Sequence, residues 1–304
     1  MSGVEQSTLR LHRYGELGLA AVIAIALALL WGYPLLALDR LFVNVDLLTH
    51  YRWASQFIDA IDQGILIPRW MPLSHLGLGD PTFLYYSPLF YYVVWGFHLI
   101  FGDVWVALKV AAVAGNALSG FVAFCALRRW MCWRLAATGA LVLQLSPVTF
   151  FLGYSHNAFP WQFAQAWVIW LLAASFEGRP KISVAWATAA VALTHILSAF
   201  MALCCISLAK LLIVLSDRDR EAWRDLFTWC GWVLLGLMAA AFYVLPAVTT
   251  QDLINSAGWR DERWLDWRNA FIFSTWTQAE FGTRWWAFQW LLPSVGSLGP
   301  ILFR

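Results

Sequence analysis

The chain has 304 residues, of which 61% are hydrophobic and 12% charged, and its formal net charge is +2. A typical soluble domain has roughly a quarter of its residues charged, so a water-soluble fold of this length could not bury so much apolar surface. The small net charge gives no reason to expect nucleic acid or another highly charged partner. The composition therefore predicts an integral membrane protein, and the 21 Trp and 9 Tyr agree, because these side chains collect at membrane interfaces.

Several stretches are apolar and long enough, or nearly so, to span a bilayer. They lie at 17–38, 83–102, 104–127, 135–153, 159–176, 182–215 and 226–248. The run at 182–215 is too long for one comfortable span, and we expect it to break at Leu193-Thr194-His195 into two shorter helices. The pattern predicts an all-α, polytopic membrane protein with a single domain over residues 1–304.

Lys and Arg in the short loops predict the orientation, because positive charge is retained on the cytoplasmic side. If every run crossed, Arg128, Arg129 and Arg134 would lie outside, so one early run must fail to cross. The best candidate is 83–102, which opens with Tyr85-Tyr86-Ser87-Pro88. We therefore predict about seven crossings and a cytoplasmic N-terminus. The predicted cytoplasmic residues are Arg10, Arg13, Arg128, Arg129, Arg134, Arg179, Lys181, Arg218, Arg220 and Arg224, and the outer segments are 39–103, 154–158, the turn at His195, and 249–304.

The last outer segment, 249–304, mixes tryptophans with Arg, Asp and Glu, a composition suited to a helix lying in the membrane interface. Packing is the simpler explanation for these side chains. Because no further span follows before Arg304, one interpretation is that the chain is a fragment of a longer protein. The tryptophans are Trp259, Trp264, Trp267, Trp276, Trp285, Trp286 and Trp290.

The first outer loop holds the residues best suited to chemistry. In a helix beginning near Asp46, His50 lies one turn later on the same face, and Trp53, Phe57 and Ile61 continue at that spacing. Such a juxtamembrane helix would be amphipathic, rest on the membrane and hold Asp46 near the lipid headgroups. The alternative is that Asp46 only caps the helix, because Asp is a favoured N-cap residue.

Arginines and aromatics in the same loop suit a lipid-linked phosphate, because guanidinium pairs bidentately with phosphate oxygens. Arg52 lies in the expected helix, and Arg69 follows in Ile67-Pro68-Arg69-Trp70. Both arginines could instead be solvated anchors at headgroup depth. The turn Gly77-Leu78-Gly79-Asp80-Pro81 is not a nucleotide-binding loop, because no Lys-Ser/Thr follows it and no strand precedes it.

Two further histidines are candidates for the site. His156, in Tyr154-Ser155-His156-Asn157, belongs to the same outer face, although it could simply be an exposed loop residue. His195 interrupts an apolar stretch, where an ionisable residue is a functional candidate, but a hydrogen-bonded helix break explains it nearly as well. Asp46, His50 and His156 could also hold a divalent metal, although no spacing signature requires one.

This layout resembles the GT-C superfamily of membrane glycosyltransferases, which includes oligosaccharyltransferase catalytic subunits, protein O-mannosyltransferases and aminoarabinose transferases. Asp46 matches the acidic residue that follows the first span in these enzymes. Ser87-Pro88-Leu89 matches a proline element that opens a non-crossing segment, and Ser155-His156-Asn157 matches a polar second outer loop. Leu193-Thr194-His195 resembles a Leu-Thr-Lys turn of the aminoarabinose transferases, with His in place of Lys.

Pro68-Arg69-Trp70 and Gly77-Leu78-Gly79-Asp80-Pro81 look closest to bacterial membrane proteins labelled 6-pyruvoyl-tetrahydropterin synthase-related or YfhO-like. The pterin label implies soluble zinc chemistry, which this sequence does not support. The chain departs from the mannosyltransferases in lacking an Asp-Glu pair in the first loop, and from the oligosaccharyltransferases in lacking acidic residues in the second. The resemblance implies a bacterial inner (plasma) membrane as the location.

The resemblance implies inverting transfer of a sugar from a polyprenyl-phosphate donor to an acceptor on the outer face. Asp46 would be the general base, and positive charge nearby would stabilise the leaving phosphate. A transporter or lipid flippase is the main alternative, although the spans are poor in charge apart from Lys109 and show no repeat. A non-catalytic scaffold is another. The expected substrate-binding residues are His50, Arg52, Arg69, Tyr85, Tyr86, His156 and His195, with Tyr85, Tyr86, Tyr91 and Tyr92 lining the prenyl path.

Overall fold

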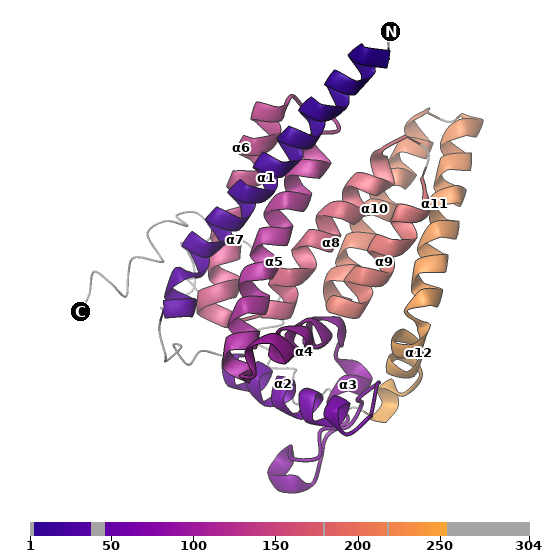
Figure 1. Cartoon of the computed structure of the whole chain (residues 1–304). Helices are drawn as coiled ribbons and strands as arrows, with labels where there is room; N and C mark the ends of the chain where they lie inside the picture. The colour runs from indigo at the N-terminus through magenta and orange to yellow at the C-terminus, as the bar shows by residue number, and fades with distance from the viewer. Residues whose placement is uncertain (1–2, 38–45, 179, 218, 254–304) are drawn as a thin grey trace, which may run out of the picture.

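The computed structural model describes residues 3–37, 46–178, 180–217 and 219–253, and the statements below concern these ranges (Figure 1). Within them the chain is helical and has no strand, and a single isolated bridge joins Met71 to Asp80. The all-α prediction is therefore confirmed. The tryptophans expected in the last outer segment lie outside the described residues.

Long helices run side by side along the molecule (Figure 1). In the centre, α5 packs against α1, α6 and α8, and α9 packs against α8, α10 and α11. The π-helix η2 (Phe151–His156) continues the line of α6 through α7 (Pro147–Phe150). The helices of the bundle are α1 (Gly3–Ala37), α5 (Val104–Leu127), α6 (Trp133–Gln144), α8 (Phe159–Phe176), α9 (Ile182–Thr194), α10 (Ile196–Asp217) and α11 (Arg220–Ala239).

In the described part of the chain, 4 helical segments are long and apolar enough to cross a membrane. A fifth is formed if α11 and α12 (Ala241–Thr249), which meet at 84°, count as one bent span. The helix α8 is not among them, because Gln162 and Gln165 lower its mean hydropathy. The helix α9 is too short, with 13 residues or about 20 Å against a hydrocarbon core of about 30 Å. A membrane protein is supported, but seven crossings are not. The four segments are 14–37, 104–127, 133–154 and 196–217.

The end of the bundle at which α1 begins also holds the basic loops. Arg128, after α5, donates through Nε to Glu16 of α1 at 3.0 Å. Arg129 pairs with Glu177 after α8, and Lys210 of α10 pairs with Asp225 of α11. These contacts bring the predicted cytoplasmic loops together, and we call this end the basic end.

Three further helices lie across the opposite end of the bundle, which we call the far end (Figure 1). They are α2 (Leu47–Asp62), α3 (Thr82–Tyr85) and α4 (Leu89–Phe101). The helix α4 packs against α2, α5 and α9. With 13 residues it is too short to span, which agrees with the prediction that the run at 83–102 does not cross.

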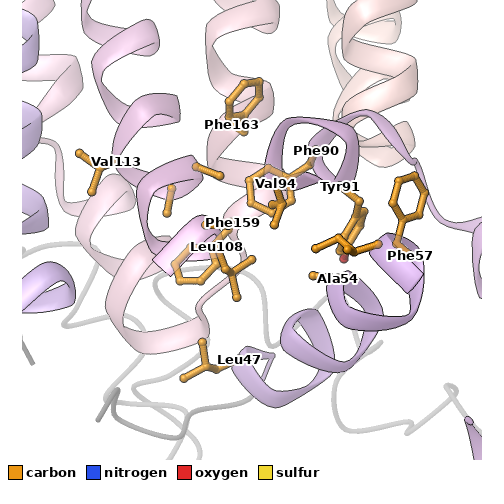
Figure 2. Packing of buried hydrophobic residues seen from close by; sticks show 14 of the residues in the cluster. Leu47, Ala54, Phe57, Phe90, Tyr91, Val94, Leu108, Val113, Phe159 and Phe163 are labelled. Carbon is orange, nitrogen blue, oxygen red and sulfur yellow. The ribbon is translucent and has the colours of Figure 1, made fainter. Parts of the chain in front are cut away.

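The apolar face of α2 is buried in protein and does not rest on the membrane. Figure 2 shows Leu47, Ala54 and Phe57 of α2 facing Tyr91 of α4 and Leu108 of α5. All five side chains have no exposed surface. The prediction of a helix after Asp46 is confirmed, but the predicted contact of its apolar face with lipid is wrong, because α4 and α5 cover that face.

Candidate functional site

Asp46 stands at the N-terminus of α2 at the far end. Its backbone N–H donates to the carbonyl oxygen of His156 at 3.1 Å, which ties α2 to η2. Its side chain makes no capping hydrogen bond, so the interpretation as a simple N-cap is wrong. Partial burial raises the pKa of Asp46, and the neighbouring His156 opposes that rise. The far end therefore holds a half-buried carboxylate that is more basic than an exposed aspartate.

His156 is the last residue of the π-helix η2. Asn157 follows in the left-handed region at φ 56°, and its Nδ2 donates to the carbonyl of Gly153 at 2.8 Å. The imidazole of His156 packs against the ring of Phe151, with centroids 4.2 Å apart. Burial lowers the pKa of His156, while Asp46 opposes the change, so this ring is mainly neutral at pH 7. Single π-helical turns are frequent at functional sites, and this one places His156 beside Asp46.

His50 is enclosed in the core, with 3% of its surface exposed. Its Nδ1 lies 2.7 Å from the hydroxyl of Tyr91 on α4. Burial lowers the pKa of His50 to about 3, and His195 adds to the shift, so the imidazole is neutral. The structure thus gives His50 a role as a hydrogen-bond partner between α2 and α4. Its contact with a substrate stays a prediction.

The tyrosines expected to line a prenyl path have different surroundings. Tyr86 packs against Trp53 with ring centroids 4.7 Å apart, and burial together with nearby Asp46 raises its pKa. Tyr85 donates to the carbonyl of Thr250, after α12, at 2.8 Å. Tyr91 has no exposed surface, so it cannot line an open path. Tyr86 is thus the tyrosine that remains best placed beside Asp46. Tyr92, further along α4, donates to the carbonyl of Leu66 at 2.6 Å.

A serine hydroxyl is built into the break between α9 and α10. In an uninterrupted helix the N–H of Ile196 would donate to the carbonyl of Ala192, four residues earlier. Instead, Oγ of Ser87 accepts from Ile196 at 3.0 Å and donates to Ala192 at 2.9 Å. The hydroxyl therefore sits within the helical hydrogen-bond ladder, which is one of the known causes of a kink. The predicted break at Leu193-Thr194-His195 is confirmed.

The ring of His195 completes this break by capping α10. Its Nδ1 accepts from the N–H of Ser198 at 3.2 Å and lies 2.8 Å from the hydroxyl of the same residue. An accepting Nδ1 leaves the proton of the neutral ring on Nε2. Trp161 stacks on the imidazole, with centroids 5.7 Å apart and planes 5° apart. Burial lowers the pKa of His195 to about 4, so the cap is intact at neutral pH. The interpretation as a hydrogen-bonded helix break accounts for this residue.

The two arginines of the first loop lie in different surroundings. Arg52 is exposed on α2. Arg69 donates through Nη2 to the carbonyl of Phe242 on α12 at 2.5 Å. Burial raises the pKa of Asp46, and the side chain that opposes this rise is His156. The structure therefore joins Asp46 to His156, and contact of the arginines with a phosphate stays a prediction.

The turn Gly77-Leu78-Gly79-Asp80-Pro81 closes a small loop. Met71 and Asp80 exchange two backbone hydrogen bonds, at 2.7 and 3.1 Å, and Nε2 of His75 lies 2.7 Å from the Asp80 carboxylate. Gly79 has φ +84°, and a Cβ there would lie 2.4 Å from the ring of Trp70. The glycines are thus required by the backbone and by close packing.

No three side chains of His, Cys, Asp or Glu come together as metal ligands in the part of the chain that the structure describes. The imidazole of His50 is directed at Tyr91, and Asp46 is paired electrostatically with His156. The divalent-metal site considered for Asp46, His50 and His156 is therefore not assembled here.

No protein family, curated protein or solved structure matches this chain. Its function must therefore be inferred from the site itself.

Gln162 belongs to the far end but was not among the predicted site residues. It lies near the start of α8, one turn after Phe159, whose ring is 6.4 Å from that of His50. Only 2% of Gln162 is exposed, and neither side-chain polar atom has a hydrogen-bond partner among the described residues. Buried amides are nearly always satisfied, so Gln162 is a candidate for a polar contact with a ligand. The one signal in the sequence is a glutamine within an apolar run.

Proposed function

We propose that this protein is a membrane glycosyltransferase that moves a sugar from a polyprenyl-phosphate donor to an acceptor hydroxyl at the non-cytoplasmic surface of a bacterial plasma membrane. The observation that supports this best is the Asp46 carboxylate, which is half-buried, makes no capping hydrogen bond and lies beside His156. Asp46 directly precedes α2, which lies across the end of the bundle opposite the basic loops (Figure 1), and the positive-inside rule assigns those loops to the cytoplasm.

In the proposed reaction, Asp46 takes the proton of the acceptor hydroxyl. The acceptor oxygen attacks the anomeric carbon of the sugar, and the bond from that carbon to the phosphate oxygen breaks. The electron pair leaves with polyprenyl phosphate, and the configuration at the anomeric carbon inverts. A carboxylate whose pKa is raised by burial suits this role, because a general base works best when its pKa lies nearer the working pH.

The leaving phosphate needs positive charge around it. Burial lowers the pKa of His156 and of His195, so both rings are better suited to donate hydrogen bonds than to carry charge. We assign the charge to Arg69 and Arg52. A guanidinium has five N–H donors, and the contact from Arg69 to Phe242 engages one of them, which holds the group in place.

The test uses the purified protein in lipid nanodiscs with a panel of radiolabelled polyprenyl-phosphate sugars. Asp46→Asn removes the base and keeps the shape, and the expected rate is lower by about 100-fold or more. Asp59→Asn is the matched control, because Asp59 is exposed on the same helix, and it should transfer sugar at the native rate. Thermal unfolding of both variants checks that each one is folded.

A native transfer rate in Asp46→Asn would show that the base assignment is wrong. Absence of transfer by the wild-type protein from every donor in the panel would reject sugar transfer itself. A transporter is less well supported, because transporters break helices near the membrane midplane. Here the α9–α10 break is hydrogen-bonded to Ser87 and α12 to Arg69, and both residues belong to the segment that lies across the far end.

A further inference from the structure

A cleft of about 390 Å³ lies between α1, α5 and α6, toward the basic end and away from Asp46. This volume is typical of a ligand pocket. Three of its lining residues, Leu19, Ile23 and Leu141, are also 53%, 40% and 42% exposed on the outside of the bundle. The cleft therefore opens sideways, toward the bilayer.

The length of the cleft matches one leaflet of a membrane. Along α1 its lining runs from Gly15 to Leu27, which is about 18 Å of helix. Half of a bilayer's hydrocarbon core is about 15 Å. A single extended acyl chain that enters from the leaflet at the basic end would follow the cleft over its length.

The amide nitrogens on the inner wall of the cleft have hydrogen-bond partners within the protein. Nε2 of Gln144, on α6, donates to the carbonyl of Ala24 at 2.7 Å and to Oδ1 of Asn116 at 2.9 Å. Nδ2 of Asn116 donates to the backbone carbonyl of Gln144 at 3.4 Å. Since these donors are already engaged, an apolar occupant would leave neither amide nitrogen without a partner.

Charge is concentrated at the mouth of the cleft. Glu16 lines it and pairs with Arg128 at 3.0 Å. Trp133 lines it too, and the guanidinium of Arg134 lies 5.7 Å from its ring centroid. These side chains carry one negative and two positive charges, so the mouth favours an anionic group. Trp and Arg at this position are typical of the headgroup region.

We propose that this cleft binds one acyl chain of an anionic phospholipid from the leaflet at the basic end, with the lipid phosphate at Arg134. An apolar cleft with positive charge at its opening is complementary to an acyl chain attached to an anionic headgroup. The proposal is independent of sugar transfer and depends only on the chain lying in a membrane.

The first experiment fills the cleft. The full chain is purified, stripped of lipid, and titrated with phosphatidylglycerol or phosphatidylcholine of identical acyl chains, and bound lipid is counted by native mass spectrometry. Wild type should retain one phosphatidylglycerol per chain. Ala20→Phe, on the lining, should lose it, whereas Ala26→Phe, exposed on the same helix outside the cleft, should keep it. If Ala20→Phe unfolds, Ala137→Leu on the α6 wall replaces it.

The second experiment removes the charge at the mouth. Wild type should prefer phosphatidylglycerol over phosphatidylcholine by about fivefold, the effect expected for one arginine near a membrane surface. Arg134→Gln should abolish that preference, and Arg224→Gln, exposed on α11, should keep it. Equal binding of the two lipids by wild type, or unchanged binding in the cleft-filling variants, would overturn the proposal. A second copy of the chain cross-linked into the cleft would overturn it as well.

Discussion

Replacing Ser87 by alanine tests whether one hydroxyl holds the α9–α10 break open. Ser87 is 2% exposed, and its hydroxyl links the N–H of Ile196 to the carbonyl of Ala192. Alanine removes both of these hydrogen bonds, each worth about 1 kcal/mol net and more where a group stays buried without a partner, and also the longer contact of Oγ with the Tyr243 hydroxyl at 3.3 Å. We expect a loss of about 2–3 kcal/mol. For a chain of this size that corresponds to an unfolding temperature lower by roughly 4–10 °C.

Thermal unfolding in one detergent at one heating rate, followed by tryptophan fluorescence, gives the comparison, because membrane proteins seldom unfold reversibly. The matched control is Ser119→Ala, whose hydroxyl donates only to Gly115 one turn earlier in α5, and it should shift the midpoint by less than about 2 °C. Hydrogen exchange of the segment that contains Ile196 should accelerate in Ser87→Ala alone. Equal midpoints and equal exchange in the two variants would refute the assignment of the break to Ser87.

Three further changes test packing, protonation and the site. A Cβ at Gly236 would lie 2.4 Å from the carbonyl oxygen of Ala185, whereas one at Gly231 would meet nothing. Gly236→Ala should therefore lower the stability of the protein by about 1–3 kcal/mol, and Gly231→Ala should raise it by about 0.5–1 kcal/mol. Unfolding midpoints that move in the same direction in the two variants would contradict the close α9–α11 contact. In the folded protein the pKa of His195 is about 4, below its ordinary 6.5. The neutral ring therefore stabilises the fold fully above pH 6.5. This contribution, on the order of 3 kcal/mol, is lost as the pH falls toward 4. His195→Asn keeps a capping acceptor that does not titrate, so its unfolding midpoint should fall less than that of wild type between pH 7.5 and 4.5; equal falls would argue against the cap. Gln162→Leu removes a buried amide without a described partner, so it should raise stability by about 1–2 kcal/mol while lowering sugar transfer, and a destabilised variant would show that the amide has a structural partner.

The positions of the helices were largely readable from the sequence, because each depends on local composition. Periodic apolar residues indicated the helix after Asp46, and the excessive length of the run at 182–215 indicated its break. The number of crossings could not be read in this way. The helix α8 carries glutamines and α9 is short, and both are placed by packing against their neighbours, which a count of apolar residues does not describe.

Contacts between distant segments were the part that sequence could not supply. Ser87-Pro88-Leu89 was recognised as a motif, but the partners of its hydroxyl lie on α9 and α10, more than 100 residues later. The same holds for Asp46, whose neighbour His156 comes from η2. Arg69 was expected beside Asp46 because both lie in one loop, yet it contacts α12. Proximity along the chain was a poor guide where the loop is long and folded back on the bundle.

The charge balance at the far end limits what kind of substrate could use it. Asp46 is the anion of the cluster, and burial lowers the pKa of its neighbour His156 and of His50 in the first turn of α2. A phosphate brought close to this cluster would raise the pKa of Asp46 and of His156 together, because an added negative charge favours the protonated form of each. The donor would thus make the base stronger and would also oppose the lowering of the His156 pKa by burial, whereas a neutral substrate would do neither. The wild-type rate should therefore depend on pH through Asp46, with a higher pKa in kcat, which reports the donor complex, than in kcat/KM, which reports the free protein. Asp46→Asn should remove that dependence, and equal pKa values in the two profiles would argue against a phosphate at this site.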